Sequence, residues 1–308
     1  MKLLVRIAGV AAIGGCLAAP LMAQHPPVSP GTWAIQGARI EPVSAPAIAN
    51  GTVVIRDGLI VAAGASVAVP ADARVIDGAG LTVYPGFIDS YGSLGIPSQQ
   101  QGGGQAGAQA AAGRRSAANS RYASGLQSEV RASAELDPAD DAFDSARSAG
   151  ITAALTAIPS GVFRGSSVLI ALGGGSPAEL VIRDDVAQHI GFSRGGGFGG
   201  GGGYPGSLLG VFAQLRQQLL DAGHWRDLNA AAARNPRGNQ RPAHDPSLEA
   251  LQPVIAGTRP VVMQANTARE IDRALKLARE FNLKPIIADG REAGKVADQL
   301  RAAGADVL

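Results

Sequence analysis

The chain has 308 residues, of which 46% are hydrophobic, 4% aromatic and 17% charged, with 42 Gly, one Cys and four His. This composition is typical of a globular chain with glycine-rich stretches, and it excludes a collagen-like, a disordered and a disulfide-stapled protein. Basic and acidic residues number 27 and 25, and two of the basic ones lie in a leader without acidic residues. The rest of the chain is therefore neutral, which argues against nucleic acid or an anionic membrane surface as partner.

Residues 1–23 have the features of a secretory signal peptide, with two early positive charges, an apolar run through Ile13 and small residues up to Ala23. The run is too short to cross a bilayer, so no transmembrane span is predicted. We expect export to the periplasm, with a mature chain beginning near Gln24. An alternative cut before Cys16, where the sequence resembles a bacterial lipobox, would leave a lipid-anchored chain. Neither cut leaves a Cys for a disulfide or for thiol catalysis.

Residues 24–84 are predicted to form a small β domain. Short alternating segments occur at 32–36, 52–57, 59–64 and 74–77. Asp57-Gly58 separates two of them and is typical of a tight hairpin, because Gly adopts the positive φ that such a turn needs.

Two low-complexity segments interrupt the rest of the chain. Residues 97–125 consist mostly of Gln, Gly, Ala, Ser and Arg, and residues 194–206 are mostly Gly. Both would bury little apolar surface, so both are predicted to be loops. The second is not a phosphate-binding loop, because no Gly-Lys-Ser/Thr follows it.

Helices and strands are predicted between and after these loops. The predicted helices cover residues 140–149, 207–222, 247–256, 268–281 and 293–303, and the predicted strands cover 151–156, 167–172, 179–183, 260–264, 284–288 and 305–308. The last third contains two consecutive strand–helix units with continuous apolar strands. This pattern predicts a parallel α/β sheet and favours a barrel.

Three motifs give the sequence a family resemblance. The hairpin at 51–64, Val75-Ile76-Asp77-Gly78 and Tyr84-Pro85-Gly86-Phe87-Ile88-Asp89 occur in this order. Together they resemble the amidohydrolase superfamily, in particular its imidazolonepropionase-like and prolidase-like bacterial branch. The resemblance implies an α/β fold, with a (β/α)8 TIM-type barrel over residues 85–308 and a small composite β-sandwich that includes residues 24–84. It also implies hydrolysis of carbon–nitrogen bonds by divalent metal ions, such as zinc, at the barrel mouth.

The family's metal ligands are missing from their expected places. A His-x-His pair would follow Asp89, but Ser90, Tyr91 and Gly92 stand there. Gln264 ends a strand that often ends in His in the family, and Asp289 follows the next predicted strand. Asp89, Gln264 and Asp289 are the candidate residues of the barrel mouth. No metal site, no cofactor and no catalytic residue is assigned to this chain.

Other polar residues are interpreted without a catalytic role. The histidines have no partner at the spacing that ligand pairs use, so they are expected on the surface or in loops, with one of them capping a helix next to Trp225: His25, His189, His224 and His244. Asp184 and Asp185 are adjacent and predict a turn rather than an acid/base pair. Pro159-Ser160-Gly161 lacks the Gly-x-Ser-x-Gly pattern of a nucleophile and also predicts a turn.

Without its loops, the segment 85–308 is shorter than the about 250 residues of a usual barrel. The strand that would supply the family's catalytic Asp would lie beyond Leu308, so we expect a C-terminally truncated barrel with an open edge that an oligomer or partner covers. Three hypotheses stay open: a hydrolase of an amide, dipeptide or cyclic amide; a non-catalytic exported protein that binds a small amide, a peptide or a partner; and a marginally stable truncated product. Whether the chain is an enzyme is not decided by the sequence.

Overall fold

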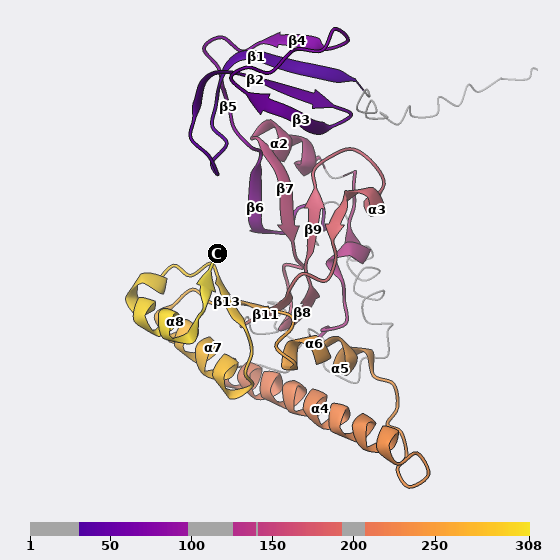
Figure 1. The fold of residues 1–308 in the computed structure, drawn as a ribbon. Helices are drawn as coiled ribbons and strands as arrows, with labels where there is room; N and C mark the ends of the chain where they lie inside the picture. Colours follow the sequence, from indigo (N-terminus) through magenta and orange to yellow (C-terminus); the bar gives the residue numbers. More distant parts are fainter. Residues whose placement is uncertain (1–30, 98–125, 140, 193–206) are drawn as a thin grey trace, which may run out of the picture.

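The computed structural model describes residues 31–97, 126–139, 141–192 and 207–308. The signal peptide, Cys16, His25 and nearly all of the two low-complexity segments lie outside these residues. The described part is a mixed α/β fold with three sheets, which follow one another along the molecule (Figure 1). The expected α/β class is therefore present, while the division into domains at residue 84 stays a prediction.

The first sheet contains five strands centred on β1. They are β1 (Thr32–Ile40), β2 (Ile48–Arg56), β3 (Leu59–Gly64), β4 (Arg74–Asp77) and β5 (Thr82–Val83). β2 and β3 pair antiparallel, and Asp57 and Gly58 between them have φ values of 50° and 80°. Two consecutive positive φ values are those of a type I′ turn, so the predicted hairpin is confirmed. The sheet buries Ala34, Ala38 and Val53.

The second sheet has the strand order β10-β9-β7-β6. Its elements are β6 (Phe87–Gly92), the 3-10 helix η1 (Ala132–Glu135), α2 (Ala142–Ser148), β7 (Ile151–Thr156), β9 (Val168–Ala171), α3 (Pro177–Leu180) and β10 (Val181–Arg183). β6 and β7 are parallel, and β7 matches the predicted strand. α2 ends before Gly150, whose φ of 84° is accessible to Gly at little cost.

The third sheet has the strand order β14-β13-β12-β11-β8. Its strands are β8 (Phe163–Ser166), β11 (Gln188–Gly191), β12 (Val261–Gln264), β13 (Pro285–Ala288) and β14 (Asp306–Val307). Its helices are α4 (Leu208–Arg234), α5 (Pro246–Ala250), α6 (Gln252–Ile255), α7 (Ala268–Glu280), η2 (Ala293–Val296) and α8 (Ala297–Ala303). β11 to β14 are all parallel, so the two predicted strand–helix units are confirmed.

Two predicted helices differ from the structure, and two strands were not predicted. α4 does not stop at Ala222 but continues to Arg234, which places His224 inside the helix rather than at its cap. The predicted helix over residues 247–256 is two short helices, α5 and α6. β8 and β11 were not predicted, because each is only four residues long and contains polar residues and Gly.

The interior contains two large apolar clusters and one small one. The largest lies between α4, α7 and the third sheet, and the next between α2 and the second sheet. In the small cluster, Ala187, Val262 and Ala288 pack with the partly buried Tyr91 and Ile286. Tyr91 belongs to β6 and the others to the third sheet or its flank, so the two sheets face each other there. Polar residues at this inner face form the candidate site.

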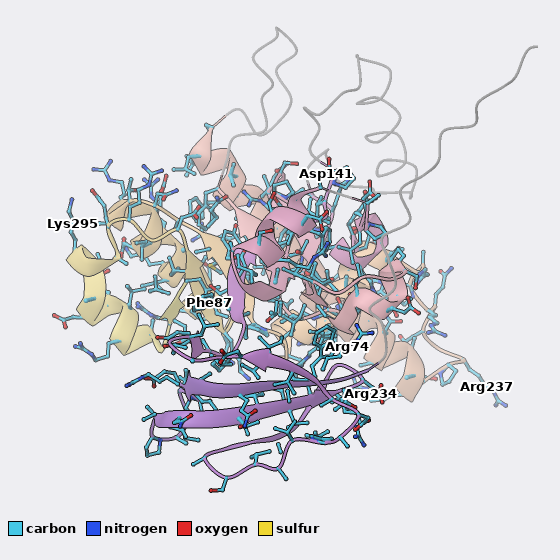
Figure 2. All side chains as sticks on the ribbon, turned by 90° about the horizontal axis from the view of Figure 1, so that it is seen from above. Arg74, Phe87, Asp141, Arg234, Arg237 and Lys295 are labelled. Atoms are coloured by element: carbon cyan, nitrogen blue, oxygen red, sulfur yellow. The ribbon has the colours of Figure 1, made fainter. Side chains whose placement is uncertain are left out.

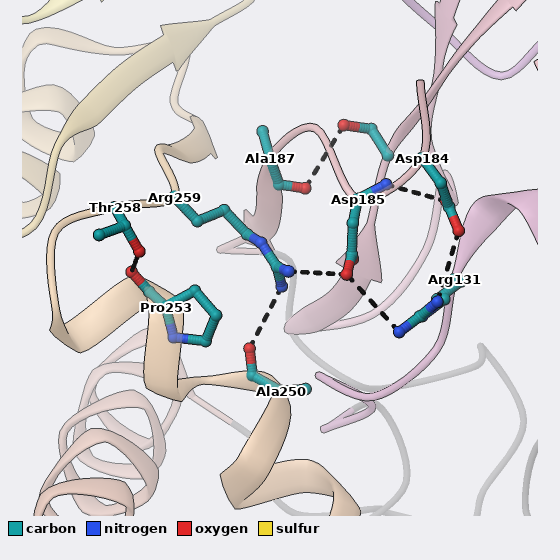
Figure 3. Close-up of polar contacts among 9 residues, drawn as sticks. Arg131, Asp184, Asp185, Ala187, Ala250, Pro253, Thr258 and Arg259 are labelled. Carbon is teal, nitrogen blue, oxygen red and sulfur yellow. Dashed lines mark hydrogen bonds and ion pairs between the residues drawn. The ribbon is translucent and has the colours of Figure 1, made fainter. Parts of the chain in front are cut away.

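Asp184 and Asp185 lie in the turn after β10, as predicted, and join three segments by ion pairs (Figure 3). Arg131 lies 3.5 Å from Asp184 and 3.7 Å from Asp185, and Arg259 donates to Asp185 at 2.7 Å. Arg259 also donates to the carbonyl of Ala250 at 3.3 Å. Two arginines and two carboxylates balance in charge, so we assign this cluster a structural role. Among the described residues, no helix is long and apolar enough to span a membrane.

Candidate functional site

A small cavity lies where the second and third sheets meet. Its volume is about 150 Å³, and it is lined by Tyr91, Gly92, Ser93, Ala157, Ile158, Pro159, Arg164 and Gln264. Gln264 is the last residue of the parallel strand β12, and residues 157–159 follow the end of β7. Ligand sites in α/β folds collect at such strand ends, because loops there present side chains to one space.

Gln264 links a cation to an anion at this cavity. Its Oε1 accepts a hydrogen bond from the Arg164 guanidinium at 2.5 Å, and its Nε2 donates to Oδ2 of Asp289, also at 2.5 Å. The orientation of the carboxamide follows from its partners, since a guanidinium has only donors and a carboxylate only acceptors. The structure thus brings together two of the three predicted mouth residues, Gln264 and Asp289.

Asp289, which accepts the hydrogen bond from Gln264, has a left-handed backbone conformation. Its φ is 69°, in the left-handed region that Asp tolerates better than most residues. Its side chain is exposed at the end of β13, so the carboxylate borders the solvent rather than the core. Asp289 therefore gives the outer rim of the site a negative charge.

Asp89 lies apart from this network. Its Oδ1 accepts from the backbone N–H of Tyr91 at 3.2 Å, within its own strand β6. Gly92 lies so close that an added Cβ would be 2.7 Å from Oδ2 of Asp89. Within the described part of the chain, Asp89 has no hydrogen bond to Gln264 or Asp289, so the structure does not unite the three predicted residues.

Arg164 is the positive charge of the site, and the sequence analysis did not identify it. Its side chain belongs to β8 and is only 4% exposed, and its Nε donates to the carbonyl of Gly161 at 3.0 Å. Its guanidinium lies over Gly191, where an added Cβ would be 2.1 Å from Nη2. Burial lowers the pKa of Arg164, opposed by Tyr91 and Asp289. A guanidinium nevertheless stays protonated in proteins, so the cavity retains a cation.

Tyr91 and His189 complete the inner face. Their rings are parallel, with centroids 5.9 Å apart and 4° between the planes. Burial raises the pKa of the Tyr91 phenol, with the Arg164 guanidinium acting in the opposite direction. Tyr91 stands in the segment where the family has its His-x-His pair, and here it contacts Arg164 and borders the cavity.

The expectation for His189 was wrong, since it is not a solvated loop residue. It lies in β11 and is 2% exposed. Burial, and then the charge of Arg164, lower its pKa to about 3, so the imidazole is neutral at physiological pH. Its Nε2 has no hydrogen-bond partner among the described residues. The strand that contains His189 was not predicted, and His189 is the only histidine among the described residues that lies at the inner face.

These residues do not fit a divalent metal ion. A hydrolytic zinc site needs three or more His, Asp, Glu or Cys ligands around one point, and the described residues contain no such group. Outside them, the only residues of these types are Cys16, His25 and Asp140. Arg164 would also repel a cation bound beside Gln264. Among the described residues, the metal-dependent chemistry that the family resemblance implies has no ligand set.

Comparisons with known proteins show the fold. No protein-family model and no curated protein matches the chain. Among solved structures, an amidohydrolase from Thermotoga maritima MSB8 has a TM-score of 0.71 and 20% identity, over 89% of this chain and 69% of that one. A prolidase complexed with N-methylphosphonate-L-proline has a TM-score of 0.39 and 16% identity, over 90% of this chain and 65% of that one. The first similarity shows that this chain has the α/β fold of that amidohydrolase.

Proposed function

We propose that this chain binds a small amide or short peptide in the cavity at the strand ends, and that it does so without a metal ion. The observation that carries the proposal is the hydrogen-bonded chain from Arg164 through Gln264 to Asp289. Amide groups have one acceptor and one donor, which such a site can satisfy together. The buried apolar wall at Ala157 and Ile158 would contact the nonpolar part of the ligand.

Hydrolysis of a carbon–nitrogen bond is the second candidate function. The fold shared with the Thermotoga amidohydrolase favours it, whereas the ligand set around the cavity does not support the metal chemistry that the resemblance implies. A fold alone does not determine an activity, because unrelated functions share common folds. The residues of the site therefore favour binding.

The finer expectations from the sequence are part of this proposal. We infer an exported, periplasmic protein, with lipid anchoring through Cys16 as the alternative. We also infer that the second and third sheets are a partial TIM-type barrel and that the first sheet belongs to a β-sandwich. The parallel order of β11 to β14 and the family motifs in the sequence support these inferences.

The test is calorimetric titration of the purified chain with N-acetylglycinamide, with and without zinc, together with a turnover assay on glycylglycine. We expect saturable binding that zinc does not change and no turnover by chromatography. Arg164→Met should weaken binding about tenfold or more, because a hydrogen bond from a charged group contributes about 1.5–3 kcal/mol. Arg301→Met is the control, since Arg301 is exposed on α8. Stoichiometric zinc with hydrolysis of the dipeptide would instead establish the second candidate.

A further inference from the structure

The carboxamide of Gln264 lies between two opposite charges in one fixed direction. Its oxygen faces the buried Arg164 guanidinium, and its nitrogen faces the exposed Asp289 carboxylate, each at 2.5 Å. Gln264 is also one of the residues that line the cavity, so its end group borders the space that a ligand would enter. A side chain of this protein thus already bridges the cation and the anion of the site.

We propose that Gln264 is an internal substitute for the ligand, and that the site selects the primary carboxamide group. This inference rests on the proposed function and specifies its ligand. A bound carboxamide would place its C=O at Arg164 and its N–H at Asp289 after the Gln264 side chain has turned away. Gln264 is then a competitor that lowers the affinity of the resting protein.

The two charges explain why a carboxamide is preferred to other small groups. A carboxylate ligand would accept from Arg164, but its second oxygen would face Asp289 with like charge. An alkylammonium ion would donate to Asp289 but would face the guanidinium. A neutral carboxamide, which has an acceptor and a donor on the same carbon, satisfies both Arg164 and Asp289. Repulsion between like charges then disfavours the carboxylate and the alkylammonium ion.

The size of the cavity restricts the rest of the ligand. A volume of about 150 Å³ is below the roughly 300–1,000 Å³ of sites for drug-sized molecules. The apolar wall of Ala157, Ile158 and Pro159 adjoins it. A carboxamide with a short alkyl or peptide substituent fits this combination of size and polarity.

The experiment removes the internal competitor and supplies the amide from solution. Gln264→Ala should bind acetamide at least tenfold more tightly than the wild-type chain, measured by NMR titration of backbone amides. Acetate and methylammonium should bind much more weakly than acetamide. If Gln264→Ala does not fold by circular dichroism, Gln264→Ser creates similar space and is compared in the same way.

Two controls distinguish this gain in acetamide affinity from non-specific binding in the cavity that a truncated side chain leaves. Gln264→Leu keeps the volume but fills the position, so it should not gain acetamide binding. Gln218→Ala truncates another buried Gln, which does not line this cavity. The Nε2 of Gln218 donates to Ser128 Oγ, and the distance between these two atoms is 3.2 Å. Gln218→Ala should not gain binding either, because the carboxamide nitrogen of Gln218 donates to a neutral hydroxyl and not to a carboxylate.

The outcomes distinguish the inference from the proposed function. If Gln264→Ala fails to bind acetamide, or binds acetate equally well, the inference is wrong even where the wild-type chain binds N-acetylglycinamide. If Gln264→Ala binds acetamide while the wild-type chain binds neither amide nor peptide, the internal substitution stands and the proposed function fails.

Discussion

At the scale of single residues, one buried charge determines the chemistry of the site. Arg164 stands between Phe163 and Gly165 in a strand that is buried throughout. A charged residue in such a run needs partners, since an unpaired buried charge is strongly unfavourable. One partner, the carbonyl of Gly161, is three residues away, but Gln264 is 100 residues away in the sequence. Burial, and then the same charge, lower the pKa of the neighbouring His189.

The buried His189 predicts how stability depends on pH. Its pKa of about 3 in the folded chain is below the about 6.5 of an unfolded chain. The unfolded state therefore takes up the proton first, and stability is lost as pH falls from about 6.5 towards 3, by at most about 1.4 kcal/mol per pH unit. His189→Phe, which keeps a ring against Tyr91, should flatten this dependence in urea unfolding between pH 7 and pH 4.5.

The exposed His244 provides the control for this measurement. Its side chain is 69% exposed, so His244→Gln should leave the pH dependence close to that of the wild-type chain. Equal slopes for wild-type and His189→Phe chains would show that His189 is not buried as a neutral imidazole.

At the scale of elements, the amphipathic part of α4 is shorter than the helix itself. Nearly all its buried residues lie before Gly223, and only Ala232 is buried after it. The second half projects from the rest of the molecule, towards Arg234 and Arg237 (Figure 1, Figure 2). The apolar pattern in the sequence ends where contact with the core ends, while the Ala-rich segment after it continues the helix by intrinsic propensity.

A substitution at Gly223 distinguishes the observed helix, which continues to Arg234, from the predicted helix, which ends at Ala222. In the structure it lies inside α4 with nothing within 4 Å of an added Cβ. Gly223→Ala should therefore stabilise the chain by up to about 1 kcal/mol in thermal unfolding. A helix that ended at Ala222 would place Gly223 in a cap, where Ala would destabilise. Gly150→Ala is the matched case, because the φ of 84° at that cap should make Ala cost about 1 kcal/mol or more.

At the scale of the whole molecule, β6 is an exposed strand beside the first sheet. It pairs with β7, and no other strand of the described residues pairs with it. Phe87 and Ile88 on this strand are 61% and 67% exposed, and Phe87 lies where the first sheet meets the rest of the molecule (Figure 2). Apolar edge strands of this kind favour association between chains.

We therefore expect the chain to self-associate with increasing concentration in analytical ultracentrifugation. Ile88→Lys should reduce this association, because a charged residue on an edge strand disfavours pairing with another chain. Val43→Lys is the control, since Val43 is 83% exposed outside any strand. A wild-type chain that sediments as a monomer at all concentrations would contradict the prediction.

Much of the local structure followed from the sequence alone. Asp57-Gly58 specified the hairpin because the turn depends on backbone conformations that few residues adopt. The strand–helix units from β12 to β14 followed from apolar periodicity, which reports burial directly. The sequence also identified Gln264 and Asp289 as residues at strand ends, although not their contact with each other.

Only the tertiary structure decided the composition of the site. Arg164 and His189 lie on four-residue strands, too short and too polar for periodicity to detect. Their burial results from packing of the third sheet against β6. Gln264 meets both charged partners only when β8, β11, β12 and β13 have assembled into one sheet. Local patterns specify elements because they depend on near neighbours, whereas the cation, the amide and the anion are brought together by contacts between distant parts of the chain.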